Sequence, residues 1–305
     1  MEGAHPSGRA KPVMVHSGEL RSGKGSHDEN FPVASRLIKR RHRPLILAFY
    51  EFVRVADDIA DHPDLSSAEK IDRLDRLESS LLGNGGDEPE GLHLREVLSS
   101  RGLSPRHAQD LLSAFRQDAT KLRYANWDEL IDYCSRSAMP VGRFVLDVHG
   151  EDRSTWPASD ALCAALQIIN HLQDCGKDFQ ALDRAYIPLD ALSANGCTVE
   201  ALGESRASLA LQNCLRGLVV RTSALLDESR GFEAKVKDTR LALEISVIQS
   251  LASQLLAMLM VRDPLADRVH LTKTEALAVA ASGGGRAILR RFLRTVGPAQ
   301  RYQTP

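Results

Sequence analysis

The stretch from residue 45 to residue 61, Leu-Ile-Leu-Ala-Phe-Tyr-Glu-Phe-Val-Arg-Val-Ala-Asp-Asp-Ile-Ala-Asp, is apolar around most of its circumference when it is wound as a helix. A helix of this kind lies inside a protein, surrounded by other elements. The stretches 161–174 and 241–261 have the same character. Several buried helices in one chain predict an all-α fold in the form of a single large helical bundle.

The rest of the chain between its two ends also carries apolar residues at spacings of three and four. This periodicity predicts helices near 31–61, 66–83, 91–101, 104–122, 126–149, 158–180, 198–203, 206–230, 236–261 and 272–281. No stretch alternates apolar and polar residues between turn signals, so strands are expected to be absent or minor. Residues 1–25 and 283–305 have the composition of flexible ends, the second one basic, which leaves 26–282 as one helical domain.

The composition is that of an ordinary globular protein of 305 residues, with 43% apolar residues and a formal net charge of −1. This balance provides no overall field for nucleic acid, so no nucleic-acid partner is expected. Five cysteines without a Cys-x-x-Cys pair favour a reducing compartment. The start of the chain lacks the apolar core of a secretory signal, and no run approaches the roughly eighteen apolar residues of a membrane span. We therefore expect a cytoplasmic protein.

Four pairs of aspartates are spaced by four residues, which on a helix places both carboxylates on one face, near enough to share a divalent cation. Asp263 and Asp267 flank a proline in a connection of solvated character, so this pair is interpreted as structural. Asp128 and Asp132 lie at an expected helix start, where acids favour the positive end of the helix dipole. A cap and a solvated face explain that pair.

The other two pairs, Asp57/Asp61 and Asp174/Asp178, end the most apolar helices, where an ionised carboxylate without a partner would be costly. Polar residues precede each pair on the same helix face; they are Tyr50 and Arg54 on the first helix and Gln167 and Asn170 on the second. Two matching polar stripes predict facing walls of one cavity, in which magnesium could bridge the carboxylates and a diphosphate. The alternative is a structural network in which Arg54 and the basic residues of 39–43 form ion pairs with these aspartates.

Three motifs, taken in this order, resemble the squalene and phytoene synthase family over roughly residues 27–280. The first is Tyr50-(x)3-Arg54-x-x-Asp57-Asp58-Ile59-Ala60-Asp61, and the second runs over 133–142, Tyr-Cys-Ser-Arg-Ser-Ala-Met-Pro-Val-Gly. The third runs over 167–178, Gln-Ile-Ile-Asn-His-Leu-Gln-Asp-Cys-Gly-Lys-Asp, and is followed by Arg184-Ala185-Tyr186-Ile187-Pro188. The resemblance implies a helical bundle of the isoprenoid synthase type with a central active-site cavity, and a magnesium-dependent reaction on an isoprenoid diphosphate.

The resemblance also implies roles for single residues. Tyr50 and Tyr133 would line the cavity near the reacting carbons, with a satisfied core tyrosine as the other interpretation of Tyr133. Arg54 would hold phosphate, and Asn170 would support the second metal site. The metal ligands, which also act in catalysis, would be Asp57, Asp61, Asp174 and Asp178, and the remaining substrate-binding residues would be Gln167, Asn170, Asn30 and Phe31.

Residues 29–32, Glu-Asn-Phe-Pro, and the Met139-Pro140 step are similar to the hydroxysqualene synthase branch of this family, which belongs to bacterial hopanoid biosynthesis. That branch implies conversion of presqualene diphosphate to hydroxysqualene and pyrophosphate, with water in place of a hydride from NADPH. Magnesium is then the expected cofactor and NADPH is not. Asp28, Glu29 and Asn30 are candidates for delivering the water, and helix capping is the alternative role of Asp28 and Asn30.

Two other functions stay open on the sequence. One is a head-to-head prenyl synthase that makes presqualene diphosphate, squalene or phytoene from prenyl diphosphates, and the other is a non-catalytic assembly or binding protein of the same fold. The basic, amphipathic stretch 286–294 could rest on the inner face of the membrane, pack on the domain or stay solvated. Neighbouring enzymes of the squalene pathway are further candidate partners.

Overall fold

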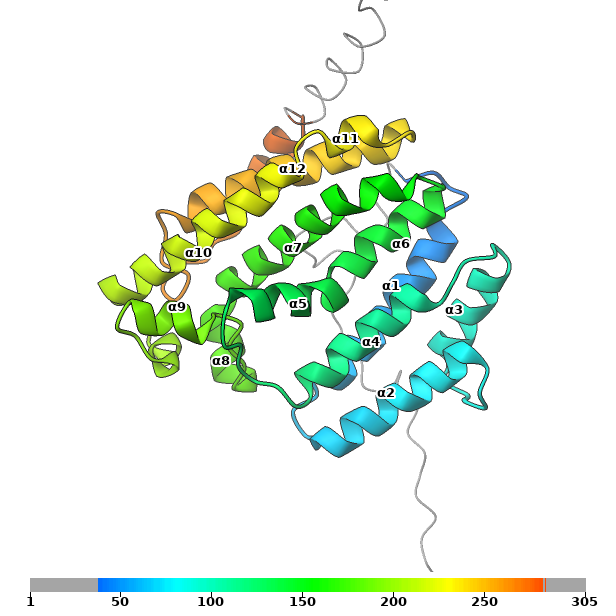
Figure 1. Ribbon diagram of the computed structural model, residues 1–305, viewed down its shortest axis with the longest axis horizontal. Helices are drawn as coiled ribbons and strands as arrows, with labels where there is room; N and C mark the ends of the chain where they lie inside the picture. The colour runs from blue at the N-terminus through cyan, green and yellow to red at the C-terminus, as the bar shows by residue number, and fades with distance from the viewer. Residues whose placement is uncertain (1–37, 282, 284–305) are drawn as a thin grey trace, which may run out of the picture.

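A computed structural model of the chain describes residues 38–281 and residue 283, and these residues form a bundle of helices (Figure 1). Across this part of the chain the only β-pairing is an isolated bridge between Arg123 and Ala185. The all-α prediction is confirmed. In chain order the elements are α1 (Arg43–Ala60), α2 (Ser67–Leu82), α3 (Pro89–Ser99), α4 (Arg106–Asp118), α5 (Trp127–Ser137), α6 (Met139–His149), η2 (Arg153–Thr155), α7 (Trp156–Gln173), α8 (Cys175–Leu182), α9 (Leu189–Ala194), η3 (Val199–Gly203), α10 (Leu209–Glu228), α11 (Phe232–Lys235) and α12 (Thr239–Leu259).

Two hydrophobic clusters hold the bundle together. One is built around α7 with residues of α5, α10 and α12, and the other joins α1 to α2, α3 and α4. Helix α6 joins them, because its Leu146 belongs to the first cluster and its Phe144 and Val148 to the second. In Figure 1, α2 and α3 therefore lie on one side of the molecule and α10 and α12 on the other, with α6 and α7 between them.

Helix α1 contains the stretch that opens the sequence analysis. Its first turn includes Pro44, whose missing N–H has no intrahelical partner at that position anyway. Phe52, Val55 and Ile59 are at most 1% exposed, as expected of a helix that is apolar on most sides. The helix is shorter than predicted, because residues 38–42 form turns and α1 begins at Arg43. The part of that prediction on residues 31–37 lies outside the described residues.

Two of the predicted helices, 126–149 and 158–180, are each interrupted, which corrects the prediction, whereas 206–230 and 236–261 contain the continuous helices α10 and α12. Between α5 and α6, Ala138 leaves helical geometry at φ −125° and ψ −46°. Pro140 explains this break, because its ring lacks an N–H and clashes with the carbonyl four residues earlier. Between α7 and α8 the break is at Asp174, with φ −102° and ψ 10°. Gly176 in the following turn has a low helix propensity and lets α8 pack closely, since a Cβ there would lie 2.6 Å from a methyl of Leu265.

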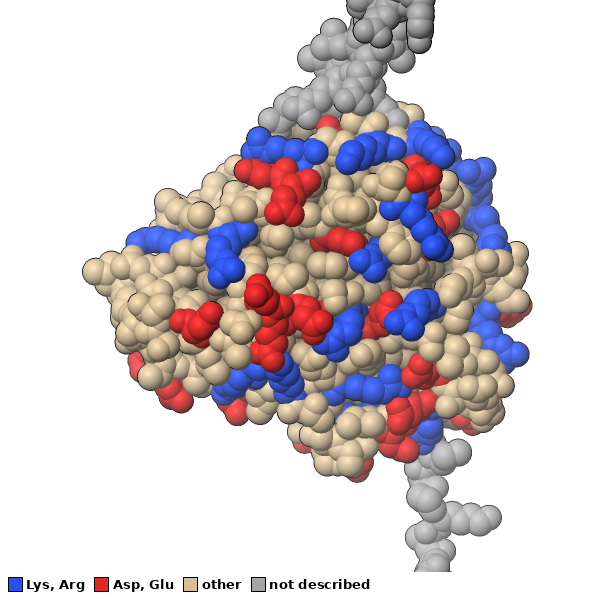
Figure 2. Space-filling view, in the orientation of Figure 1, with Lys and Arg blue, Asp and Glu red and all other residues tan. Residues whose placement is uncertain are grey.

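Helix α12 shares a property with membrane spans. Among the described helices it alone is long and apolar enough to cross a bilayer, with a mean hydropathy of 1.5, yet half of that apolar window is buried inside the bundle. A core helix of a large bundle has the same composition. On the face of the molecule in Figure 2, basic and acidic side chains are interspersed, in agreement with the net charge of −1.

Candidate active site

The end of α1 carries the first aspartate pair and a cation that holds it. Arg54 donates through Nη1 to Asp57 Oδ2 at 2.9 Å and through Nη2 to Asp58 Oδ1 at 2.8 Å. The side chain of Asp58 is buried at 5% exposure, whereas that of Asp57 keeps 38% and can still meet a ligand. Arg54 thus forms ion pairs, as the structural alternative expected, and at the same time it fixes the orientation of Asp57.

Asp61 is held by a second guanidinium group, that of Arg184. Arg184 donates through Nη1 to Asp61 Oδ1 at 2.8 Å and to the Tyr186 hydroxyl at 3.3 Å, and through Nη2 to the Asp118 carbonyl at 3.1 Å. The chain places Arg184 here because the Ala185 N–H donates to the Leu122 carbonyl at 2.9 Å, just after α4. Arg184 is only 5% exposed, so it acts as a fixed positive charge behind Asp61.

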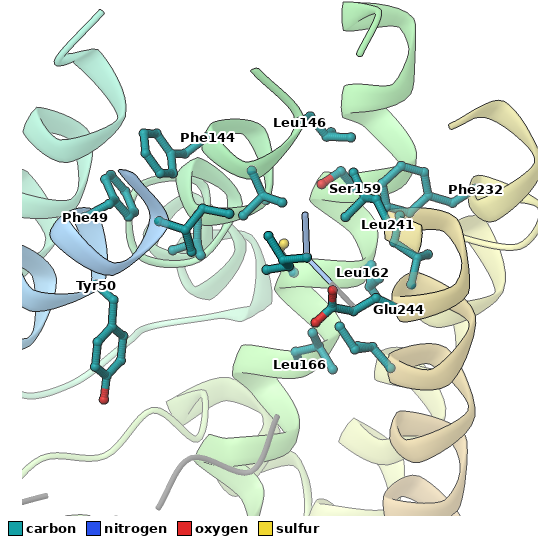
Figure 3. A pocket seen from close by; sticks show the side chains of 18 of the residues that line it. Phe49, Tyr50, Phe144, Leu146, Ser159, Leu162, Leu166, Phe232, Leu241 and Glu244 are labelled. Atoms are coloured by element: carbon teal, nitrogen blue, oxygen red, sulfur yellow. The ribbon is translucent and has the colours of Figure 1, made fainter. Parts of the chain in front are cut away.

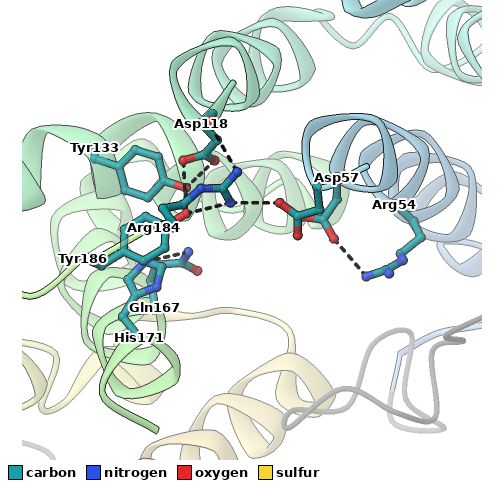
Figure 4. A network of polar contacts seen from close by, with 9 residues as sticks. Arg54, Asp57, Asp118, Tyr133, Gln167, His171, Arg184 and Tyr186 are labelled. Carbon is teal, nitrogen blue, oxygen red and sulfur yellow. Dashed lines mark hydrogen bonds and ion pairs between the residues drawn. The ribbon is translucent and has the colours of Figure 1, made fainter. Parts of the chain in front are cut away.

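Behind Arg184 lies a buried carboxylate, that of Asp118 at the end of α4 (Figure 4). It accepts the Tyr133 hydroxyl at 2.7 Å and the Tyr186 hydroxyl at 3.1 Å, and it is 4% exposed. Tyr133 therefore supports Asp118 and is not among the described residues that line the apolar cavity, and its place beside the reacting carbons stays a prediction. The motif 184–188 was a signal from which Arg184 and Tyr186 could have been predicted as site residues. The sequence has no motif or spacing that identifies Asp118 as one.

The second wall of the site consists of the polar residues of α7 and the aspartate pair Asp174/Asp178, and it begins on α7. Gln167 Nε2 lies 3.2 Å from His171 Nε2, and the His171 ring stacks on the Tyr186 ring with centroids 3.6 Å apart. These contacts link α7 to the network around Asp118. The predicted stripe from Gln167 to Asp178 is not carried by one helix, because Asp174 ends α7 and Asp178 lies on α8. The break lets the two carboxylates of this pair project from separate helices.

Burial and neighbouring carboxylates raise the pKa of one aspartate in each wall. Burial, together with the charges of Asp174 and Asp61, raises the pKa of Asp178 to about 7, against the lowering effect of Arg184. Burial and the charge of Asp61 raise the pKa of Asp57 to about 7, against the effect of Arg54. Since the charge of Asp61 acts on both groups, Asp57 and Asp178 share one electrostatic environment. Added positive charge there would lower the pKa of both carboxyl groups.

An apolar cavity of about 260 Å³, drawn in Figure 3, is lined in part by α1 and α7, the helices that end at Asp61 and Asp174. It lies between α1, α6, α7 and α12, and Phe49, Phe144 and Leu162 are among its walls. Tyr50 lines it from α1, one turn before Arg54, and Leu166 lines it from α7, directly before Gln167. A diphosphate at the aspartates could therefore extend an attached hydrocarbon into the cavity.

The defining pattern of the squalene/phytoene synthase family matches residues 25–275, which is most of the chain. The chain belongs to the squalene/phytoene synthase family. Hydroxysqualene synthase of Rhodopseudomonas palustris is 58% identical over 278 residues, which cover 91% of this chain and 95% of the relative. Hydroxysqualene synthase of Sinorhizobium fredii is 55% identical, over 95% of this chain and 99% of the relative.

A solved structure agrees with the assignment. The crystal structure of squalene synthase HpnC from Alicyclobacillus acidocaldarius matches this fold with a TM-score of 0.67 at 33% identity, over 79% of this chain and 90% of that chain. The resemblance inferred from the three motifs is thereby confirmed, and so is the fold of the isoprenoid synthase type. Members of the squalene/phytoene synthase family process prenyl diphosphates and generally depend on a metal.

The residues of this family member fit a metal that is shared with its substrate. Within residues 38–281 and 283, no three His, Cys, Asp or Glu side chains converge closely enough to enclose an ion by themselves. Magnesium is commonly held by one or two carboxylates, several waters and substrate phosphates, so an open arrangement suits it. The raised pKa values of Asp57 and Asp178 mark where added positive charge would be most effective.

The remaining aspartate pairs have structural roles in this family member, as the sequence predicted. Asp263 accepts the Ala207 N–H at 2.8 Å, which ties together two loops. Asp132 forms an exposed ion pair with Arg136 at 2.6 Å on the surface of α5. The predicted substrate-binding residues Asn30 and Phe31, and the candidates for delivering water at 28–30, lie outside the described residues.

Proposed function

We propose that this chain is a hydroxysqualene synthase, which converts presqualene diphosphate and water to hydroxysqualene and pyrophosphate. The observation that carries the proposal is the grouping of Asp57, Asp61 and Asp178 beside an apolar cavity. Relatives of that name at 58% and 55% identity, aligned over nearly their whole length, support this choice of reaction within the family. The pathway implied is bacterial hopanoid biosynthesis.

The polar end of the site would bind the diphosphate and promote its departure. Magnesium would be held by the four aspartates together with Asn170, and when bound it draws negative charge from the leaving diphosphate. Arg54 lies at the same end and would contribute to phosphate binding, while Gln167 lies on the wall that leads there. Arg184 orients Asp61 and adds a fixed positive charge where negative charge develops. The residues in these proposed metal positions are Asp57, Asp61, Asp174 and Asp178.

The apolar end would bind the hydrocarbon and control the fate of the cation. When the carbon–oxygen bond of presqualene diphosphate breaks, both electrons leave with the diphosphate and a cyclopropylcarbinyl cation remains. The walls of the cavity, with Tyr50 at the side nearest the aspartates, exclude bulk water from this cation. One water then adds to the cation and loses a proton, which yields the alcohol. This route consumes no hydride, so NADPH has no part in the proposal.

The proposal can be tested with the purified protein and two substrates. Farnesyl diphosphate and presqualene diphosphate are each incubated with magnesium, with and without NADPH, and the extracted products are identified by mass spectrometry. We expect hydroxysqualene from presqualene diphosphate alone, whether or not NADPH is present. Presqualene diphosphate, squalene or phytoene formed from prenyl diphosphates would identify a head-to-head synthase instead. No turnover of either substrate would support the non-catalytic alternative.

We further propose a cytoplasmic enzyme of one helical domain whose basic tail, residues 283–305, contacts the inner face of the membrane. A basic amphipathic segment is suited to an anionic lipid surface, and the product is an oily alcohol that must leave the cavity. Residues 284–305 lie outside the described residues. Liposome binding by the full chain and by a chain that ends at residue 282 tests this proposal, and equal binding by the two chains would reject it.

A further inference from the structure

The start of α12 meets two other parts of the chain at one corner of the bundle. Lys39, which precedes α1, forms an ion pair with Asp238 at 2.7 Å. The backbone N–H groups of Lys237 and Asp238 each donate to the carboxylate of Glu151, just after α6, at 2.7 Å. These contacts bring the approach to α1, the end of α6 and the start of α12 together.

Most of the exposed charged side chains at this corner are basic. The acids Asp238 and Glu151 are buried and used in the contacts above, whereas Asp152 is exposed and caps η2 through the Ser154 N–H at 2.8 Å. Figure 2 shows basic side chains along the edge of the molecule where α11 and the start of α1 lie in Figure 1. We call the exposed basic residues that gather here the basic corner; they are Arg40, Arg41, Lys235, Lys237, Arg240 and Arg101, which donates to the Arg41 carbonyl.

Three side chains of the basic corner carry a charge that the described part of the chain does not compensate. Arg40, Lys235 and Arg240 form no ion pair with another described side chain. Their charge is therefore available to a partner of opposite sign. A solvated surface is the ordinary explanation of such a group, so a function has to follow from what lies behind it.

The basic corner lies at the end of the apolar cavity that is opposite the aspartates. Ile38, Phe232 and Leu241 line the cavity, and each lies within three residues of a basic side chain at this corner. Ile46 also lines the cavity, and the eleven residues of α1 from Ile46 to Asp57 correspond to about 16 Å of helix. A hydrocarbon whose diphosphate is held at the aspartates therefore extends toward the basic corner.

The last described residue, Gly283, lies against α12 near the same corner. The Ser246 hydroxyl donates to the Gly283 carbonyl at 3.3 Å, and the six residues from Arg240 to Ser246 correspond to about 9 Å of helix. The basic stretch 286–294 follows Gly283 in the sequence. The domain and its tail thus each have basic residues that begin near the start of α12.

We infer that the basic corner docks this enzyme on an anionic lipid bilayer, with the far end of the apolar cavity turned toward the lipid. The purpose of this docking rests on the proposed function, because presqualene diphosphate and hydroxysqualene both carry long hydrocarbon chains. Docking at this corner holds the diphosphate site away from the negative headgroups, and the oily product leaves at the end of the cavity nearest the bilayer. Each Lys or Arg beside an anionic lipid surface strengthens binding by about fivefold.

The test measures sedimentation of the full chain with vesicles of phosphatidylcholine that contain about one third phosphatidylglycerol. Arg40→Gln combined with Arg240→Gln removes two exposed charges without breaking an ion pair between described side chains. We expect this double variant to bind about 25-fold more weakly than wild type, with an unchanged melting temperature. Vesicles of phosphatidylcholine alone should not bind wild type. Equal binding of wild type to both kinds of vesicle, or binding by the double variant within about twofold of wild type, would overturn the inference.

Arg206→Gln combined with Arg262→Gln is the matched control. Both arginines are exposed and lie beyond the other end of α12, where the Ala207 N–H donates to Asp263 at 2.8 Å. The 21 residues of α12, about 30 Å of helix, separate them from the basic corner. This variant loses the same charge and should bind the anionic vesicles like wild type. An equal loss of binding in both double variants would mean that net charge alone governs binding, which would overturn the inference.

The two tryptophans of the chain report which side of the domain faces the lipid. Trp156 begins α7, five residues after Glu151, whereas Trp127 begins α5 and packs 4.4 Å from the guanidinium group of Arg221 on α10. Chains with a single tryptophan, made by Trp127→Phe or by Trp156→Phe, are bound to the anionic vesicles with a dansyl-labelled lipid added. Energy transfer to the dansyl group should be stronger from Trp156. Equal or stronger transfer from Trp127 would overturn the inference.

These outcomes separate the inference from the proposed function, because vesicle binding requires no turnover. Wild-type protein that binds anionic vesicles as expected but makes no hydroxysqualene would overturn the proposed function and leave the docking surface in place. Wild-type protein that makes hydroxysqualene but does not bind anionic vesicles would overturn the inference alone. If the double variant at Arg40 and Arg240 does not fold, the energy transfer from the two tryptophans decides the matter.

Discussion

The two aspartate pairs of the candidate site are held in different ways. Asp57 and Asp61 each receive a guanidinium group, from Arg54 at 2.9 Å and from Arg184 at 2.8 Å. Neither Asp174 nor Asp178 forms an ion pair with another described side chain, and the pKa of Asp178 is raised to about 7 by burial and by neighbouring carboxylates. One wall is therefore fixed in advance by the protein's own cations. On the other wall, added positive charge would favour the ionised form of Asp178.

The largest effect should follow from removing the carboxylate that lacks a protein cation. Asp178→Asn keeps the shape of the side chain and removes its charge, so metal-assisted departure of the diphosphate should slow by about a thousandfold, equivalent to about 4 kcal/mol. Because the ionised form is disfavoured where Asp178 lies, the thermal melting temperature should stay unchanged or rise. Steady-state kinetics measures the rate, and thermal unfolding measures the melting temperature. A variant that keeps more than a tenth of wild-type activity would show that this wall is dispensable.

On the first wall, removing the protein's cation should reduce stability. Arg184→Ala leaves the buried Asp118 with its two tyrosine hydroxyls and leaves Asp61 without its ion pair. We expect the free energy of unfolding to fall by about 3 kcal/mol, as when one partner of a buried pair is lost. Denaturant unfolding gives the value. Arg184→Lys is the matched variant, and it should recover only part of the loss because an ammonium group cannot bridge the same partners. Wild-type stability of Arg184→Ala would contradict the role of this network.

The raised pKa values predict how metal binding depends on pH. Asp57 and Asp178 have pKa values of about 7, so protons compete with magnesium for them below that pH. The affinity for magnesium with pyrophosphate should fall by up to about tenfold per pH unit for each carboxylate that must be ionised. Thermal shifts with and without magnesium pyrophosphate, measured from pH 6 to pH 8, test this. A thermal shift that is the same across this range would argue against these carboxylates as ligands.

Without metal, the same two carboxyl groups should make the folded protein more stable as the pH falls, whereas the affinity for metal falls in that direction. Their pKa values are higher in the folded protein than in the unfolded chain, so they favour the folded state as the pH falls through 7 toward 4, and that contribution is lost as the pH rises. The double variant Asp57→Asn with Asp178→Asn should therefore show a flatter dependence of its melting temperature on pH than wild type.

The smallest effect should come from an aspartate of identical spacing outside the site. Asp132 pairs with Arg136 at 2.6 Å, and its side chain is 65% exposed. Asp132→Asn should change the free energy of unfolding by less than about 0.5 kcal/mol and leave catalysis unaltered, because exposed ion pairs contribute little. A tenfold loss of activity in this variant would mean that spacing alone, without burial, selects the functional pairs.

Much of the fold could be predicted because helices that are apolar on most sides must be buried. A helix such as α1, apolar on most sides, has only one stable place, which is inside a bundle, and Phe52 and Ile59 are fully buried there. The breaks in the long predicted helices were harder to see. Pro140 is a visible signal for the first of them, whereas the only signal near the break at Asp174 is Gly176, whose low helix propensity is a weaker one.

The candidate site also has a part that the sequence predicts and a part that it does not. The aspartate pairs could be found because helix periodicity relates residues four apart, and the family motifs named the same residues. The contacts of Arg184 with Asp61 and Asp118 span 123 and 66 residues of sequence, and local periodicity carries no information on such separations.

The break at Asp174 places the lining of the cavity and the carboxylate of Asp178 on two different helices. Helix α7 carries the hydrocarbon lining through Leu162 and Leu166, while α8 carries Asp178 and is anchored separately by the close approach of Gly176 to Leu265. Substitutions that reshape the lining of α7 for a longer or shorter chain need not rotate Asp178. The hydrocarbon lining and the carboxylate of Asp178 are thus assigned to two helices that meet at a single residue, Asp174.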